Sequence, residues 1–289
     1  MLIPRLPIRK FDENGLFQAV YVNDLQEHLR TFHADISHPH KHDFFITVLF
    51  LAGKGTHTID FTTYSVEANS LFYLRPEQIH HWEFDEPAVG WILFHSEDFY
   101  SFHVPHFELD NWSFFSPKND THKLELSSDQ MQDLRRYFEQ IAAEYKTIQT
   151  YSFLKIASHL LLLYIEIERI RSGIIPPESS TKKPYHDHFK HFNKLLEQHF
   201  RAQHSPKFYA DALLITTKHL HRICEMNTGK NPSRFIADRI VLEAKRMLVS
   251  ETMTVREIAL QLGYENPDYF HTIFKKITGI TTKQFLLSQ

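Results

Sequence analysis

The first half of the chain alternates apolar and polar residues in a pattern that predicts β-strands. From His38 to Phe50 every second residue is apolar or a histidine, so one face of an extended strand would carry them all. These residues are His38, His40, His42, Phe44, Ile46, Val48 and Phe50. We expect a turn at Gly53 and Gly55, followed by short strands at residues 56–61, 71–74 and 89–94. Several short strands at this spacing are typical of an antiparallel barrel or sandwich.

After Ser127 the spacing of apolar residues becomes helical. Apolar residues recur at three- and four-residue intervals from Met131 to Ile141, and Ser127 or Ser128 would cap this helix. A second helix, residues 151–171, is apolar on more than one side, which indicates contact with the barrel and with another surface such as a second subunit. Residues 174–184 have the Pro, Ser and Lys content of a linker. We therefore expect a domain of residues 1–172, a linker of residues 173–184 and a second domain of residues 185–289.

The second domain contains an internal repeat. With an offset of 50 residues, Leu220 aligns with Phe270 and Cys224 aligns with Phe274. Each copy predicts a short helix, at residues 207–214 or 255–262, followed by a turn and a second helix. This arrangement is the helix-turn-helix pattern. A long helix from Pro232 to about Val249 would connect the two copies.

Local residue types also predict where these helices begin and end. Thr254 and Glu257 form a capping-box pattern, and Asn266 would cap the following helix. Gly263 suits the turn between them, because glycine adopts the left-handed conformation at little cost. In the first copy Thr216 or Thr217 would be the corresponding cap.

The candidate DNA-binding residues are those that the apolar pattern leaves exposed on the second helix of each copy. That helix enters the major groove, where each base pair presents its own pattern of donors and acceptors. We expect Arg222 to contact a guanine through its guanidinium group, and Lys275 and Lys276 to contact phosphates. The full set is Lys218, His219, His221 and Arg222 in the first copy, and Asn266, Asp268, His271, Thr272, Lys275 and Lys276 in the second.

Charge is distributed unevenly between the two halves of the chain. Residues 1–184 carry 17 basic and 25 acidic side chains, whereas residues 185–289 carry 15 basic and 10 acidic ones. A basic second half fits nucleic-acid binding.

The single cysteine, Cys224, excludes a disulfide framework, and the longest uncharged apolar run is too short for a membrane span. Because the N-terminus also lacks a signal-peptide pattern, we expect a cytoplasmic protein without membrane contact.

The segment from Gly263 to Gly279, GYENPDYFHTIFKKITG, resembles the signature of the AraC/XylS family of transcription regulators. The resemblance covers residues 186–287 and implies that two recognition helices enter adjacent major grooves, about one helical turn apart. The family often has Arg where Thr272 stands, and usually has Pro after the final glycine, where Thr281 and Thr282 stand. The first difference lowers the base readout expected of the second unit.

A second resemblance, over residues 30–100, is to the cupin barrel, the usual sensory domain of these regulators. It rests on His40-x-His42, the glycines that follow, and the segment from Arg75 to His80. In metal-binding cupins a Glu accompanies these histidines, but the apolar Ile46 stands near its place here. We expect the histidines to line a pocket for a small molecule, and three imidazoles leave a zinc-like site as the alternative. The candidate ligand-binding residues are His40, His42, Tyr73, His80 and Trp82, with Trp91 as a further aromatic wall.

The sequence thus predicts an α+β protein with two domains, an N-terminal cupin-like antiparallel β-barrel with following helices and a C-terminal all-α domain of two helix-turn-helix units joined by a long helix. The predicted function is sequence-specific transcription regulation under a small-molecule effector. We expect double-stranded DNA, a second copy of the chain and RNA polymerase as partners, and we assign no metal and no cofactor. We do not expect an enzyme, because no phosphate loop and no nucleophile context appears. A metal-dependent cupin enzyme and a ligand-free regulator acting through its abundance are the alternatives.

Overall fold

The computed structural model describes residues 3–11, 19–36, 38–105, 107–116, 121–174, 183–250 and 253–287. The chain divides into two compact units, one of residues 4–177 and the other of residues 178–289 together with residues 1–3. Most of the expected linker, residues 173–184, lies outside the described residues, but its two described ends are helical. No described helix combines the length and the apolar character needed to cross a membrane.

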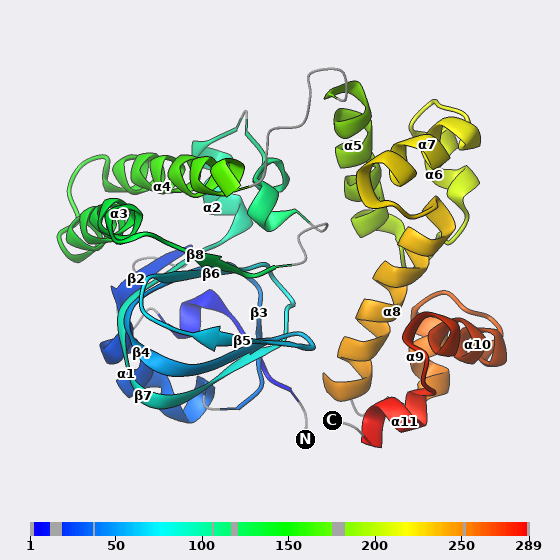
Figure 1. The fold of residues 1–289 in the computed structure, drawn as a ribbon, viewed down its shortest axis with the longest axis horizontal. Coiled ribbons are helices and arrows are strands. Elements are labelled where there is room, and N and C mark those ends of the chain that lie inside the picture. The colour runs from blue at the N-terminus through cyan, green and yellow to red at the C-terminus, as the bar shows by residue number, and fades with distance from the viewer. Residues whose placement is uncertain are drawn as a thin grey trace. The chain divides into compact units, whose positions relative to one another are not determined.

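The N-terminal unit is built on an antiparallel sheet that curls around its inner face (Figure 1). The central strands β4 and β7 pair along most of their length, and β2 lies on the other side of β7. The first part of β4 pairs with β6 and its last part with β5, while β6 also pairs with β8. A short parallel pair, β1 with β3, lies beside this sheet. The strands are β1 (Arg5–Leu6), β2 (Val20–Asp24), β3 (Lys41–His42), β4 (Phe45–Ile59), β5 (Thr62–Val66), β6 (Ser70–Leu74), β7 (His80–His95) and β8 (Lys123–Glu125).

The expected turn at Gly53 and Gly55 is wrong. β4 continues through both glycines, with shifts of register against β7 between Phe50 and Gly55. A Cβ atom at Gly55 would lie 2.1 Å from the backbone oxygen of Glu83, and one at Gly53 would lie 2.7 Å from the Cα of Ala88. These glycines therefore allow two strands to approach closely at a bulge, and they do not reverse the chain.

The predicted alternation along β4 is confirmed, because its two faces belong to two different cores. Phe44, Ile46, Val48 and Phe50 pack inside the curled sheet, in a cluster that also receives residues of α1 (Leu25–Ile36). Residues of the opposite parity, such as Phe45 and Leu49, face a second cluster with α3 (Ser128–Lys146) and α4 (Ser152–Ile174).

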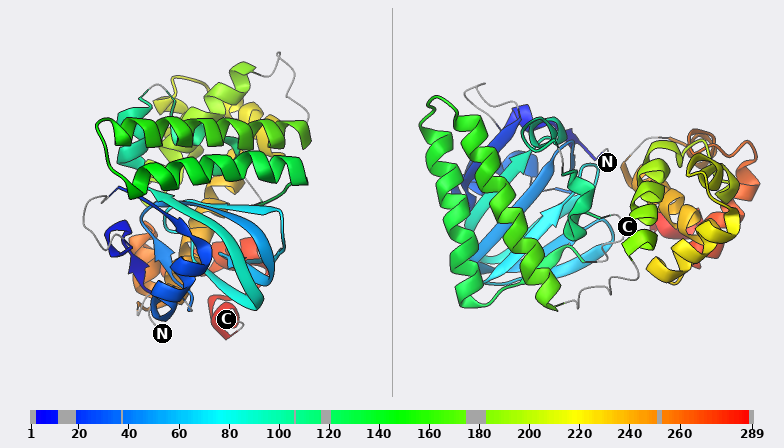
Figure 2. Two further views of the ribbon diagram at one scale, coloured as in Figure 1. Left: turned by 90° about the vertical axis from the view of Figure 1, so that its left-hand side faces the viewer. Right: turned by 90° about the horizontal axis from the view of Figure 1, so that it is seen from above.

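Helices α3 and α4 lie side by side along the outer face of the sheet (Figure 2). α3 begins as expected, since Ser127 accepts a hydrogen bond from the backbone of Gln130 and the Gln130 side chain accepts one in return. This capping box satisfies two backbone N–H groups that the first helical turn leaves without partners. The described connection between the sheet and α3 also contains α2 (Glu97–His103), η2 (Leu109–Asn111) and η3 (Ser113–Phe115), and η1 (Ile8–Lys10) lies near the N-terminus.

The regular elements described in the C-terminal unit are all helices, and the predicted repeat is present (Figure 1). Leu220 and its repeat partner Phe270 are fully buried, as are Cys224 and Phe274. The long helix α8 contacts the second helix of both copies. The helices are α5 (Lys183–His199), α6 (Pro206–Ala212), α7 (Thr217–Thr228), α8 (Pro232–Ser250), α9 (Val255–Gln261), α10 (Pro267–Thr278) and α11 (Thr282–Leu287).

The caps predicted for these helices are also found. Thr254 and Glu257 form the capping box of α9, while Thr216 caps α7 and Asn266 caps α10. Gly263, between α9 and α10, has a φ of 78°. The residues that cap these helices therefore lie within the same copy as the helix that they cap.

Candidate DNA interface and buried histidine cluster

The second helix of the first copy, α7, separates buried and exposed residues cleanly. Its apolar side, which includes Leu220 and Ile223, is fully buried, whereas Lys218, His221 and Arg222 are exposed. His219 is half-buried, and its ring centroid lies 5.7 Å from that of His188 on α5. Three of the four residues predicted for this helix are therefore accessible to a partner.

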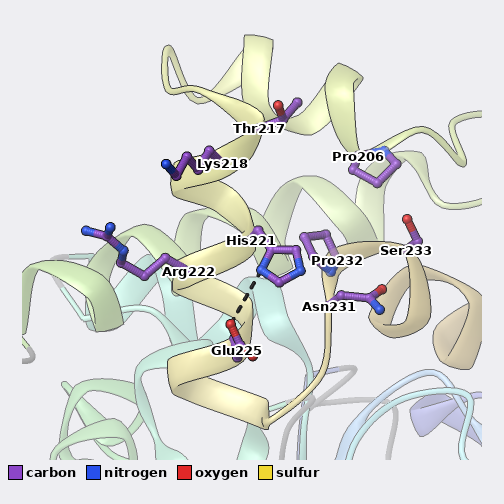
Figure 3. Close-up of a pocket in the computed structure, with 9 residues that line it drawn as sticks. All are labelled: Pro206, Thr217, Lys218, His221, Arg222, Glu225, Asn231, Pro232 and Ser233. Carbon is purple, nitrogen blue, oxygen red and sulfur yellow. Dashed lines mark ion pairs between the residues drawn. The ribbon is translucent and has the colours of Figure 1, made fainter.

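A groove of about 700 Å³ runs along this face of α7 (Figure 3). Lys218 and Arg222 project from one side of the helix, and His221 lies toward Asn231 and Pro232 at the start of α8. His221 also approaches Glu225, with 3.5 Å between its Nδ1 and a carboxylate oxygen. The sequence reasoning did not place the groove's other wall, which consists of Pro206, Asn231, Pro232 and Ser233.

The second recognition helix, α10, exposes all six residues that the sequence singled out. Several of their polar atoms already have partners within the unit. Asn266 accepts a hydrogen bond from the backbone N–H of Asp268, and the Thr272 hydroxyl donates one to the carbonyl of Asp268. His271 Nδ1 lies 3.3 Å from the hydroxyl of Thr282 on α11. Lys275 and Lys276 lie in the last turn of α10, so the lysines of this face gather at the C-terminal end of the helix.

In the N-terminal unit, four of the five predicted ligand-binding residues gather inside the sheet. His40, His42 and His80 have ring centroids 4.4 to 5.0 Å apart. The Trp82 ring lies 5.1 Å from that of His80. All four residues are buried, with exposures of 0 to 7%.

Tyr73 does not join this cluster. It lies on the opposite face of the sheet, beside Phe114 and within hydrogen-bond distance of the buried Arg171 on α4. Trp91 also packs against that outer cluster. The reason is register, because neighbouring residues of a strand point to opposite faces and Tyr73 follows the inward-facing Phe72.

The sequence reasoning missed a further histidine, His57 of β4. Its Nε2 lies 3.0 Å from Nδ1 of His80, and its side chain is fully buried. A signal was present, because His57 shares its parity with the apolar Ile59, which packs in the inner cluster. The wrong turn at Gly53 and Gly55 hid this relation.

Three histidines of this cluster, His42, His57 and His80, have lowered pKa values. Burial lowers the pKa of His42 and of His80 well below the usual value, and the neighbouring His40 lowers both further. Burial likewise lowers the pKa of His57 well below its usual value. Removing an imidazolium from water is costly, so these rings offer lone pairs rather than positive charge.

Comparison with known proteins agrees with both units. Residues 28–163 match the model of an AraC-like ligand binding domain, and residues 209–288 match a helix-turn-helix domain. The HTH-type transcriptional activator RhaR of Cronobacter sakazakii is 25% identical over 252 residues, which are 84% of this chain and 84% of that protein. The activator RhaS of Escherichia fergusonii is 22% identical over 258 residues, which are 85% of this chain and 86% of that protein.

A solved structure of ToxT from Vibrio cholerae is 11% identical and aligns over 93% of this chain and 98% of that one, with a TM-score of 0.42. The two family models together match most of the chain. The ligand-binding model matches where the fold has its curled sheet, and the helix-turn-helix model matches where it has the paired units. The protein therefore belongs to the AraC/XylS family and is a DNA-binding transcription regulator with an N-terminal ligand-binding domain.

Proposed function

We propose that α7 and α10 read adjacent major grooves of one DNA duplex, and that α7 supplies most of the sequence specificity. The exposed side of α7 carries this proposal, because Lys218 and Arg222 project together from one side of the helix. Arg222 contacts the O6 and N7 atoms of a guanine. His221 lines the groove beside them, and the half-buried His219 is the fourth residue proposed for this contact.

The second recognition helix contributes more to affinity than to specificity. Lys275 and Lys276 bind phosphates, which positions the protein without reading bases. Asp268 repels phosphates, and it can accept a hydrogen bond from a cytosine amino group. Asn266, His271 and Thr272 already engage backbone or side-chain partners, so each has fewer polar atoms left for bases.

The test compares Arg222→Ala with Lys275→Ala on the preferred duplex and on a set of single-base variants. Loss of the guanine contact weakens specific binding by about 1 to 3 kcal/mol and relaxes one base position. Lys275→Ala weakens binding to every duplex alike and lowers the salt slope by about one. If Arg222→Ala left both the preferred site and its affinity unchanged, α7 would not be the reading helix.

The N-terminal unit is proposed as the domain that binds an effector and joins two copies of the chain. A ligand that binds better to one arrangement of the domains or subunits increases the population of that arrangement. The spacing of the DNA contacts then changes with it. Exposed apolar side chains on α4, including Leu154 and Leu162, support a second copy as partner. We retain residues 1–172, 173–184 and 185–289 as the proposed effector domain, linker and DNA-binding domain.

We further propose that the protein activates transcription, through contact with RNA polymerase, and has no enzymatic activity. Support comes from the relatives named transcriptional activators, which align over more than four fifths of the chain. A cytoplasmic location follows from that role, since the DNA and the polymerase are there. A reporter gene placed downstream of the selected site tests activation, and falling expression on addition of the protein would contradict it.

A further inference from the structure

Three buried imidazole rings meet on the inner face of the curled sheet. His40, His42 and His80 each offer a ring nitrogen, and the three nitrogens lie within 4.8 Å of one another. The residues are 0 to 3% exposed. They come from both sides of a short backbone pairing, because His40 and His80 exchange two backbone hydrogen bonds of 3.1 and 2.8 Å.

The outer nitrogen of each ring is already engaged. Nδ1 of His40 lies 2.7 Å from the backbone oxygen of His38, and Nδ1 of His42 lies 3.4 Å from that of Leu6. A carbonyl oxygen can only accept a hydrogen bond, so both Nδ1 atoms carry the hydrogen and both Nε2 atoms carry a lone pair. Nδ1 of His80 lies 3.0 Å from Nε2 of His57, and when Nδ1 donates to that nitrogen, Nε2 of His80 carries a lone pair as well.

This outer set of partners resembles the usual surroundings of metal-binding histidines. Such a histidine donates its second ring N–H to a carbonyl, a carboxylate or another acceptor, which fixes the tautomer and aims the ligand nitrogen. Nε2 of His80 has no hydrogen-bond partner among the described residues, although it is fully buried. A buried polar atom without a partner costs about 1 to 3 kcal/mol, and a cation bound there would remove that cost.

The chemistry of the donors selects the kind of ion. All three donors are imidazole nitrogens, and no carboxylate belongs to this group among the described residues. Imidazole suits Zn²⁺, Co²⁺, Ni²⁺ and Cu²⁺, whereas Mg²⁺ and Ca²⁺ prefer oxygen ligands. Large organic molecules fit less well, because the inner face of the sheet is packed with Phe44, Phe72 and Phe94.

We propose that His40, His42 and His80 bind one divalent transition-metal ion of the zinc type through their Nε2 atoms, with His57 as the positioning residue for His80. Three protein ligands leave one coordination position open, as in zinc sites that bind a water or a small ligand. The proposal does not depend on the DNA contacts, since it concerns the N-terminal unit alone.

The experiment uses the full-length chain without a histidine tag, freed of metal by a chelator. Co²⁺ is titrated in while its visible d–d absorption is followed, and Zn²⁺ content is then measured by elemental analysis after dialysis. We expect saturation at one equivalent per chain, with the intense absorption of a four-coordinate site. Zn²⁺ should also raise the midpoint of thermal unfolding, because it binds only the folded state.

The variants separate ligands from neighbours. His42→Gln and His80→Gln should abolish the Co²⁺ absorption and the stabilisation by Zn²⁺. His57→Gln should weaken binding about 10- to 100-fold and keep the same spectrum, as expected for an outer-shell partner. His81→Gln is the matched control, because His81 is the next residue on β7 and its side chain is 26% exposed beside Glu83. It should change neither signal.

Two results would overturn the proposal. One is wild-type protein that binds no stoichiometric Zn²⁺ or Co²⁺, and the other is equal loss of binding in His81→Gln and His80→Gln. If the glutamine variants did not fold, electron paramagnetic resonance of the Cu²⁺-loaded wild type would decide. Coupling of the copper to three nitrogens would support the proposal, and the absence of nitrogen coupling would contradict it. DNA binding of the metal-free protein is measured in parallel, so failure of the metal site and failure of the regulator proposal remain distinguishable.

Discussion

At the residue scale, Gly263 and Gly279 have the same left-handed conformation in different surroundings. Their φ angles are 78° and 81°. A Cβ atom at Gly263 would lie 2.2 Å from the backbone oxygen of Arg201, whereas one at Gly279 would meet no atom within 4 Å. Gly279→Ala therefore costs only the conformational preference, about 1 to 2 kcal/mol.

We expect Gly263→Ala to cost clearly more than Gly279→Ala, because the Arg201 backbone must also move. Urea unfolding of the two variants, followed by circular dichroism, measures both free energies. Equal losses would mean that the turn between α9 and α10 adjusts without strain.

His95, at the end of β7, makes the N-terminal unit sensitive to acid. Its Nδ1 donates to the carbonyl of Ser96, so its Nε2 accepts the hydrogen bond from the Tyr164 hydroxyl at 2.6 Å. Burial lowers the pKa of His95 from 6.5 to about 4. The rings that face it, Phe45, Tyr100 and Tyr164, carry no charge to offset a proton there.

Because the folded pKa lies below the unfolded one, the unfolded chain takes up the proton first as the pH falls. Stability is therefore present above pH 6.5 and is lost toward pH 4, by about 2 kcal/mol between pH 7 and pH 5 for this group. Urea unfolding at both pH values checks this. His95→Gln should be less stable at pH 7 and should lose correspondingly less on acidification, and an unchanged pH difference would contradict the assignment.

At the scale of elements, the sequence predicts correctly those features that depend on residues nearby in the chain. Thr254 caps α9 through a residue three positions away, so its role is visible in a short stretch of sequence. The role of Gly55 is set by Glu83 on another strand, and no local pattern distinguishes that contact from a turn. His57 was missed for the same reason, whereas His40, His42 and His80 were found through the family resemblance.

The attachment of α5 to α8 also depends on distant partners. Arg239 on α8 forms ion pairs with Glu197 of α5 at 2.8 Å and with Glu243 at 3.1 Å, and its guanidinium lies 4.0 Å from the centre of the Phe200 ring. Its side chain is only 15% exposed. Removing one member of such a group leaves the remaining charges partly buried.

We therefore expect Arg239→Ala to lower the free energy of unfolding by about 3 kcal/mol. Arg234→Ala is the control on the same helix, because Arg234 pairs with Asp238 at 2.7 Å at a more exposed position. An exposed pair of this kind contributes about 0.5 kcal/mol. Thermal and urea unfolding distinguish the two variants, and similar losses would indicate that the group around Arg239 is as weak as a surface pair.

At the scale of the whole molecule, the proposed dimer depends on α4. Leu154 and Leu162 lie two turns apart on this helix and are 52% and 44% exposed. A charge at Leu162 would have to be buried in the dimer, so Leu162→Glu should weaken self-association at least tenfold. Sedimentation velocity over a concentration series measures this. Leu287→Glu, at another exposed apolar position, should leave the association unchanged.

The whole molecule is proposed to read one DNA site with its two linked helix-turn-helix units. Selection from random duplexes by the full-length protein, followed by affinity measurement at several salt concentrations, tests it most directly. We expect an enriched site of two short elements about one helical turn apart, with a steep salt slope. Arg222→Ala should relax the more specific element, which assigns that element to α7. Enrichment of no sequence, or of a single element unaffected by changes in α7, would contradict it.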